Sequence, residues 1–139
     1  MSDKKLNLKV ITPSKILIDE EVEAVFTTAV DGELGVLPDH IPMMTPLGVG
    51  VTKFVKNGQP NYAATIGGIF QVENNNVTIL TDSAELGEEI DLTRAKAAKE
   101  RAEARLGIAS KEIDQDRAQI AISRALARIK TASMSGGKK

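Results

Sequence analysis

The spacing of apolar residues changes near position 90, and this change constrains the fold more than any other feature of the chain. Before it, apolar and polar residues alternate over short runs such as 6–10 and 22–28, which is typical of half-buried β-strands. From Asp91 onwards, apolar residues recur every three or four positions, which is typical of amphipathic helices. We therefore expect an α+β protein in which an all-β part precedes an all-α part.

Residues 1–86 are expected to form a β-sandwich or flattened barrel. Seven or more short apolar runs alternate with turn signals, among them Asn57-Gly58, Gly67-Gly68 and the asparagines at 74–76. The aromatic residues of the chain all lie in this part, which is therefore expected to hold the larger core. They are Phe26, Phe54, Tyr62 and Phe70.

Residues 87–139 are expected to form a helical hairpin with a polar C-terminal tail. A short loop joins two alanine-rich segments and forces them antiparallel, with Gly107 ending the first helix and Ser110 capping the second. Because alanine buries little apolar surface, the two helices adhere weakly and the hairpin is separable. The expected apolar stripes are Leu92, Ala95, Ala98, Ala102 and Leu106 on the first helix, and Ala118, Ile122, Ala125 and Ile129 on the second.

The composition excludes several classes of function. The chain has no cysteine, which excludes disulfides and thiolate metal sites, and its one histidine, His40, lies in an expected loop. The motifs of phosphate loops, zinc proteases and serine hydrolases are absent, so we expect no catalysis, no metal site and no cofactor. A formal net charge of −1 argues against general nucleic-acid binding. No apolar run reaches the roughly 18 residues of a membrane span, so we expect a cytoplasmic protein without direct membrane insertion.

A stripe of arginines follows one face of each expected helix, at about 100° per residue. The first stripe is Arg94, Arg101 and Arg105, and the second is Arg117, Arg124 and Arg128. Like charges four residues apart weaken an isolated helix by a few tenths of a kcal/mol, so an anion is expected to offset this cost. Gathered across the hairpin, Arg94, Arg101, Arg124 and Arg128 would suit a polyphosphate.

Two carboxylates, Glu85 and Asp91, lie beside this expected cluster and could accept a hydrogen bond from an adenine amino group or orient the arginines. No water-activating base or metal cradle accompanies them, so such a site would hold a nucleotide without hydrolysing it. The alternative is that the arginines form an ordinary solvated helix face.

The run Gly-Glu-Leu-Gly-Val-Leu-Pro-Asp-His-Ile-Pro at residues 32–42, the pair Gly67-Gly68 before a strand, and the alanine-rich tail together resemble the epsilon subunit of bacterial F-type ATP synthases. The resemblance extends over essentially the whole chain. It implies a non-catalytic subunit whose sandwich binds the gamma subunit of the central stalk and the c subunits of the membrane rotor ring. It also implies a hairpin that folds against the sandwich or extends into the alpha/beta catalytic head, where it inhibits ATP hydrolysis. Such a subunit is peripheral on the cytoplasmic face of the cell membrane.

The resemblance also implies site residues, because the ATP-holding motif of the family is present at residues 90–95 as Ile-Asp-Leu-Thr-Arg-Ala. ATP would act as a regulatory ligand rather than a cofactor. The implied ATP-binding residues are Glu85, Ile90, Asp91, Arg94, Ala95, Arg101, Arg124 and Arg128. The implied rotor or stalk contacts are Glu33 and His40, and the implied beta-subunit contacts are Arg117, Arg124, Arg128 and Lys130. The alternatives are a purely structural coupling subunit that binds no nucleotide, and a free-standing ATP sensor.

Overall fold

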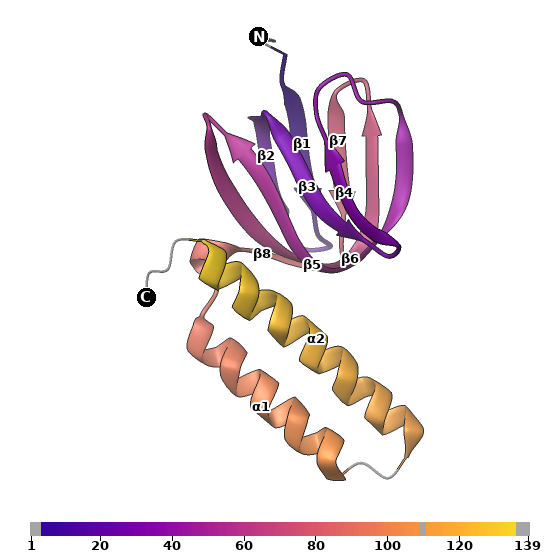
Figure 1. Cartoon of the computed structure of the whole chain (residues 1–139), viewed down its shortest axis with the longest axis vertical. Coiled ribbons are helices and arrows are strands. Elements are labelled where there is room, and N and C mark those ends of the chain that lie inside the picture. Colours follow the sequence, from indigo (N-terminus) through magenta and orange to yellow (C-terminus); the bar gives the residue numbers. More distant parts are fainter. Residues whose placement is uncertain (1–3, 109–110, 136–139) are drawn as a thin grey trace.

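The computed structural model describes residues 4–108 and 111–135. An N-terminal β-sandwich is followed by two antiparallel helices that lie at one end of it (Figure 1), as the apolar spacing predicts. The strands are β1 (Leu6–Ile11), β2 (Ile16–Val22), β3 (Ala24–Ala29), β4 (Gly32–Val36), β5 (Met43–Lys56), β6 (Gln59–Glu73), β7 (Asn76–Leu80) and β8 (Ser83–Leu86). A short 3₁₀ turn, η1 (Gly87–Glu89), leads into the helices α1 (Leu92–Ile108) and α2 (Glu112–Met134).

A single sheet, folded on itself, forms both layers of the sandwich. Its strands follow the order β2-β1-β7-β6-β5-β3-β4, with β8 also paired to β6, and only the β1–β7 pair is parallel among the described strands. Strand β6 passes from β8 to β7 at a bend made by Gly67 and Gly68, both with positive φ. A side chain at Gly68 would collide with the carbonyl oxygen of Leu80, which is why the bend requires glycine.

A row of buried threonine hydroxyls crosses the inner face of the sheet. Thr52 Oγ1 lies 2.7 Å from Thr27 Oγ1 and 2.9 Å from Thr65 Oγ1, so strands β3, β5 and β6 are joined by hydroxyl hydrogen bonds in addition to their backbone ladder. All three side chains are buried. The apolar residues of the strands surround them, and each hydroxyl therefore depends on its neighbours for a partner.

Replacing Thr52 with valine should lower the free energy of unfolding by about 2–6 kcal/mol. The shape is kept, but two buried hydroxyls lose their partner, and each such loss costs roughly 1–3 kcal/mol. Urea titration followed by circular dichroism measures the change. The control is Thr78→Val, because Thr78 is half-buried and its hydroxyl forms no hydrogen bond with the described residues. Equal stabilities of the two variants would contradict the role of the threonine row.

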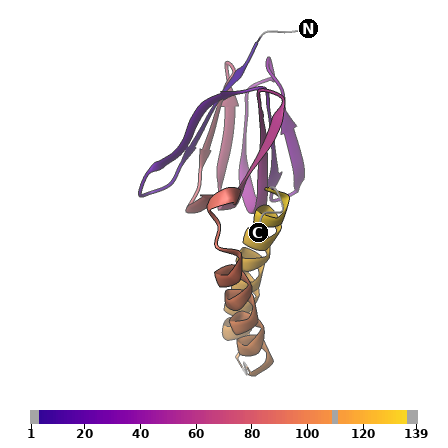
Figure 2. The same cartoon turned by 90° about the vertical axis from the view of Figure 1, so that its left-hand side faces the viewer.

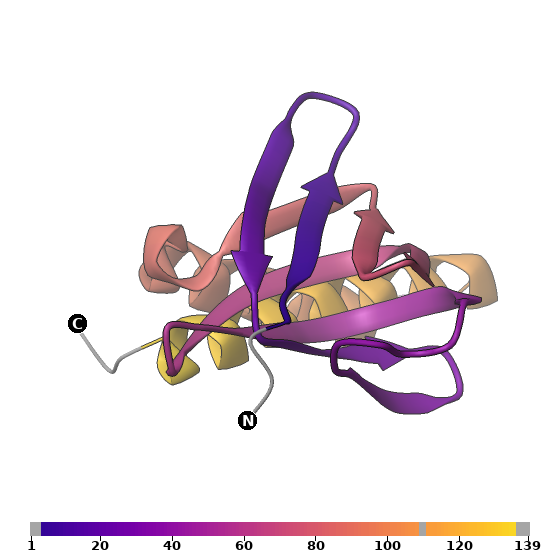
Figure 3. The ribbon, with the colours of Figure 1, turned by 90° about the horizontal axis from the view of Figure 1, so that it is seen from above.

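Helix α2 is buried on two opposite faces. One face carries Ala118, Ile122 and Ala125 and packs against α1, and the other carries Ala127 and Thr131 and packs against β5, β6 and η1. Figure 2 shows the hairpin projecting below the sandwich, and Figure 3 shows it lying beneath the sheet. The sandwich-facing stripe of α2 is absent from the sequence prediction, which contained only the stripe toward α1.

One of the two predicted helix boundaries differs from the structure. Gly107 does not end α1, because the helix continues to Ile108 and Gly107 lacks the positive φ of a glycine cap. The predicted cap Ser110 lies outside the described residues. Helix α2 begins at Glu112, and Lys111 provides no side-chain cap.

The C-terminal end of α2 lies close to Gly87 in η1. A Cβ atom placed there would lie 2.8 Å from the Cβ of Ser135 and 3.0 Å from the carbonyl oxygen of Thr131. Both distances are shorter than ordinary contacts, so a side chain at residue 87 would require the C-terminal end of α2 to shift away from η1.

Candidate functional site

A pocket of about 320 Å³ lies where β8, α1 and α2 meet, a volume near the lower end of ordinary ligand sites. Seven of the eight residues predicted to hold ATP line it, drawn from three elements that are distant in sequence. The lining residues are Ser83, Glu85, Ile90, Asp91, Arg94, Ala95, Ala98, Arg101, Ala125 and Arg128. The pocket is therefore walled by three arginines, two carboxylates and a set of small or apolar side chains.

Asp91 fixes the start of α1. Its Oδ1 accepts a hydrogen bond from the backbone N–H of Arg94 (3.1 Å), and its carbonyl oxygen accepts one from the backbone N–H of Ala95 (3.0 Å). This is an N-cap, worth about 1 kcal/mol to the helix. The Ile-Asp-x-x-Arg-Ala motif thus places Arg94 on the first turn of α1, at the mouth of the pocket.

Arg128 is the anchored cation of the site. Its Nε donates a hydrogen bond to Glu85 Oε1 at 2.7 Å, which joins α2 to β8, and its side chain is only 30% exposed. Arg94 and Arg101 are exposed and form no ion pair with the described residues. Two guanidinium groups are therefore available to an anion, and the third is already oriented by a carboxylate.

The structure does not gather all the predicted basic residues together. Arg124 is exposed one turn before Arg128 and does not line the pocket. Lys130 lies on the opposite side of α2, where it lines a groove against β3 and β5. Arg117 is exposed near the start of α2. Arg117, Arg124 and Arg128 therefore share one face of α2 by helical spacing, and Lys130 lies on another.

The two predicted rotor or stalk contacts are also separated. Glu33 is exposed on β4 and lines the same groove as Lys130. His40 lies in the loop after β4, residues 37–42, at the end of the sandwich far from the helices (Figure 1). Glu33 and His40 therefore do not form one contact surface.

Sequence reasoning missed three residues of the pocket: Ser83, Ala98 and Ala125. Ser83 precedes Glu85 by two positions on β8, and strand residues two apart share a face. Ala98 is four residues after Arg94, and Ala125 is three before Arg128, so both lie on the same helix face as an arginine. The sequence spacing could have placed each of the three residues on the same face as a predicted site residue. Only the position of β8 beside the hairpin, however, brings the three residues together.

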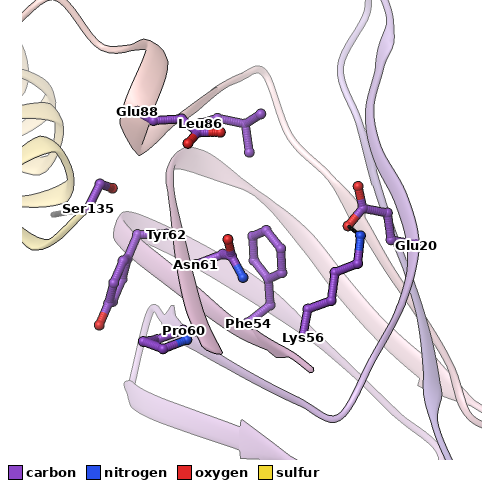
Figure 4. A pocket seen from close by; sticks show the side chains of 9 residues that line it. All are labelled: Glu20, Phe54, Lys56, Pro60, Asn61, Tyr62, Leu86, Glu88 and Ser135. Atoms are coloured by element: carbon purple, nitrogen blue, oxygen red, sulfur yellow. Dashed lines mark hydrogen bonds and ion pairs between the residues drawn. The ribbon is translucent and has the colours of Figure 1, made fainter. Parts of the chain in front are cut away.

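A second pocket, of about 270 Å³, lies where the end of α2, η1 and the β5–β6 hairpin meet (Figure 4). Its lining includes one cation, Lys56, and that cation is already paired with Glu20 at 3.0 Å. Tyr62 and Phe54 contribute aromatic surface. Because its lining has no cluster of guanidinium groups, this pocket does not suit a polyphosphate.

Within the described residues, no group of three or more histidine, aspartate or glutamate side chains is placed to hold a metal ion. None of the described helices is long and apolar enough to cross a membrane. The lining of three arginines, two carboxylates and small or apolar side chains makes the pocket basic and suited to an anion with an apolar portion.

Comparison with known proteins agrees with this architecture. Residues 5–87 match the family described as "ATP synthase, Delta/Epsilon chain, beta-sandwich domain", and residues 88–133 match "ATP synthase, Delta/Epsilon chain, long alpha-helix domain". The ATP synthase epsilon chain of Nitratidesulfovibrio vulgaris is 42% identical over 104 residues, which are 75% of this chain and 78% of that one. The chain belongs to the ATP synthase epsilon chain family. The epsilon chain of Anoxybacillus flavithermus is 47% identical over 103 residues, 74% of this chain and 77% of that one.

The fold of this epsilon chain is also similar to a chain in the Euglena gracilis mitochondrial ATP synthase, with a TM-score of 0.80 and 24% identity. The match covers 94% of this chain and 85% of that chain. A chain of the Tetrahymena thermophila central stalk and c-ring structure has a TM-score of 0.66, 13% identity and coverage of 95% and 99%. The chain is accordingly a non-catalytic subunit of an ATP synthase, as the resemblance implied.

Proposed function

We propose that this epsilon chain is a central-stalk subunit of an F-type ATP synthase and that ATP controls its C-terminal hairpin. In this role the sandwich joins the gamma subunit to the c subunits of the rotor ring, at the cytoplasmic face of the membrane. The hairpin, when extended into the alpha/beta head, inhibits ATP hydrolysis. ATP bound in the pocket holds the hairpin in the closed arrangement and so keeps the enzyme free to turn.

The observation that carries this proposal is the arginine pocket between β8, α1 and α2. Its walls come from three elements, so the complete pocket exists only while the hairpin is closed on itself and on the sandwich. A ligand that binds the closed form alone stabilises it by about 2.7 kcal/mol at a hundred times its dissociation constant. That free energy exceeds what the small alanine contacts between α1 and α2 contribute singly.

The chemistry of the lining supports a nucleoside triphosphate. Arg94 and Arg101 can bind the phosphates, and Glu85 or Asp91 can accept from an exocyclic amino group. The small side chains Ala98 and Ala125 leave room for a flat ring between the helices.

The ion pair between Arg128 and Glu85 supplies a contact that does not depend on ATP. It joins α2 to the strand that precedes the hairpin, and at 30% and 42% exposure its contribution is modest. A closed hairpin is therefore weakly favoured without ligand, which leaves the nucleotide able to decide between the two arrangements.

Two experiments separate this proposal from its alternatives. Calorimetric titration of the isolated chain with ATP distinguishes it from a purely structural subunit, which would take up no nucleotide. Copurification with a tagged gamma subunit distinguishes it from a free-standing ATP sensor, which would remain alone. We expect ATP binding and gamma copurification together.

A further inference from the structure

The loop between β4 and β5, residues 37–42, is tied to the β6–β7 turn by a reciprocal pair of side chains. The backbone N–H of Asp39 donates a hydrogen bond to Asn75 Oδ1 at 2.6 Å, and Asn75 Nδ2 donates one to Asp39 Oδ1 at 3.3 Å. These residues are 36 positions apart in the sequence. The contact therefore fixes the loop to a segment that the chain reaches only after the whole of β5 and β6.

Each member of the Asn75–Asp39 pair is also held by a further hydrogen bond from another residue. The carbonyl oxygen of Asn75 accepts a hydrogen bond from the backbone N–H of Asn7 (2.8 Å) on β1, and Lys4 Nζ donates one to Asp39 Oδ2 at 2.9 Å. The bond from Lys4, followed by the bond from Asn75, lowers the pKa of Asp39 below its ordinary value of 3.8. The carboxylate is therefore ionised at neutral pH, and its contribution is lost only as the pH falls below 3.8 through the lowered pKa.

The backbone at the contact is unusual on both sides. Asp39 has a φ of 68° and Asn75 a φ of 63°, in the left-handed region that residues with a Cβ rarely adopt. Asparagine and aspartate tolerate this region better than most residues. Because both conformations and both side-chain bonds are specified together, the loop has one defined position relative to the sheet.

In this position the outer surface of the loop 37–42 exposes two apolar side chains and one nitrogen of His40. Leu37 is 59% exposed and Ile41 is 74% exposed. His40 Nδ1–H donates to the carbonyl oxygen of Ile41 at 2.6 Å, so Nε2 is the nitrogen left for an outside partner. Figures 1 and 2 show this end of the sandwich, which also carries the N-terminus, directed away from the hairpin.

We propose that Asn75 is a positioning residue that sets the loop 37–42 for its contact with the rotor ring or stalk. The inference rests on the proposed function in one respect, the placement of His40 at that contact. In this account Asn75 does not touch the rotor itself. It holds Asp39, and through Asp39 the backbone that carries Leu37, His40 and Ile41.

The test compares two adjacent asparagines in the full-length chain. Asn75→Gly removes the side chain and keeps the left-handed backbone accessible. Asn74→Gly is the matched control, because Asn74 also has a positive φ (52°) but its side chain makes no hydrogen bond with the described residues. Asp39→Asn is the conservative variant, since its side chain can still accept from Asn75 Nδ2 while the ion pair with Lys4 is lost.

Two measurements are needed. One tests the contact between Asn75 and Asp39, and the other tests the effect of that contact on ion pumping. In the isolated chain, we expect Asn75→Gly to raise the hydrogen-exchange rate of the Asp39 amide about tenfold, the effect of losing roughly 1.4 kcal/mol of protection. In the assembled ATP synthase, we expect the same variant to lower ion pumping per ATP hydrolysed. Asn74→Gly and Asp39→Asn should stay close to the unmodified chain in both measurements.

The outcomes test the Asn75–Asp39 contact, the positioning role of Asn75 and the proposed function separately. If the Asp39 amide exchanges no faster in Asn75→Gly than in Asn74→Gly, the contact does not hold the loop and the inference falls. Faster exchange with an unchanged pumping ratio overturns the positioning role and leaves ATP binding by the hairpin untouched. Failure of the unmodified chain to join the complex would instead defeat the proposed function.

Discussion

Arg94→Ala is expected to weaken ATP binding to the isolated epsilon chain by roughly ten- to 150-fold, as judged by calorimetric titration. Arg94 lines the pocket and forms no ion pair with the described residues, so its guanidinium is available to a phosphate. A hydrogen bond to a charged group contributes about 1.5–3 kcal/mol, which corresponds to that range of affinity. The fold should be unaffected, because Arg94 is exposed.

The matched control is Arg105→Ala. Arg105 lies on the same face of α1 as Arg94 and is also exposed, but it does not line the pocket. The Arg105→Ala substitution removes the same charge from the same helix as Arg94→Ala, so a general electrostatic effect would appear in both variants. An affinity lost equally in both, or in neither, would contradict the assigned site. Asp91→Ala should also weaken binding, but it is a less selective test because Asp91 caps α1.

Deleting the chain after Glu89 is expected to relieve inhibition of ATP hydrolysis in the assembled complex without preventing assembly. The main core, which includes Leu8, Val25, Phe70 and Ile79, lies within the strands, so the shortened chain keeps the sandwich. The rate of ATP hydrolysis should rise by a factor equal to one divided by the fraction of complexes whose hairpin is not extended. The rise is about tenfold where nine complexes in ten are extended.

A locked hairpin provides the control for this deletion, because it removes extension while keeping the helices. A Cβ at position 87 would lie 2.8 Å from the Cβ of Ser135, and a disulfide needs about 3.5–4.5 Å, so a shift of roughly 1 Å admits the bond in G87C/S135C. The chain has no other cysteine. The oxidised variant should match the truncated one in hydrolysis, and a reductant should restore inhibition. A truncated complex that stays as inhibited as the intact one would exclude the hairpin as the inhibitor.

The sequence predicted most of the sandwich, because alternation and turn chemistry are local properties. Asn57-Gly58 does turn β5 into β6, and Gly67-Gly68 does bend the chain. The glycine pair was expected to separate two strands, however, whereas β6 continues through it from Gln59 to Glu73. The reason is tertiary, since β5 remains paired with β6 on both sides of the bend.

The site was predictable where residues lie close in sequence and less so where helices must be oriented. The motif at 90–95 placed Asp91 and Arg94 among the predicted ATP-binding residues, and both line the pocket because one helical turn separates them. Arg124 was grouped with Arg128 by helical spacing and by the family resemblance. The structure instead places only Arg128 against Glu85, since α2 is also constrained by its second buried face at Ala127 and Thr131. This second buried face cannot be predicted from the apolar stripe of α2 that packs against α1.

The most direct test of the account is the distance between the sandwich and the end of α2 as ATP is added to the isolated chain. Because the chain lacks cysteine, labels can be attached through cysteines introduced at the exposed positions Gln59, at the start of β6, and Ser133, near the end of α2. We predict that ATP shifts the population to a single short distance, with a midpoint equal to the calorimetric dissociation constant, and that Arg94→Ala raises this midpoint by the same roughly ten- to 150-fold factor as the dissociation constant. ATP binding that leaves the distance distribution unchanged would contradict the claim that the nucleotide closes the hairpin.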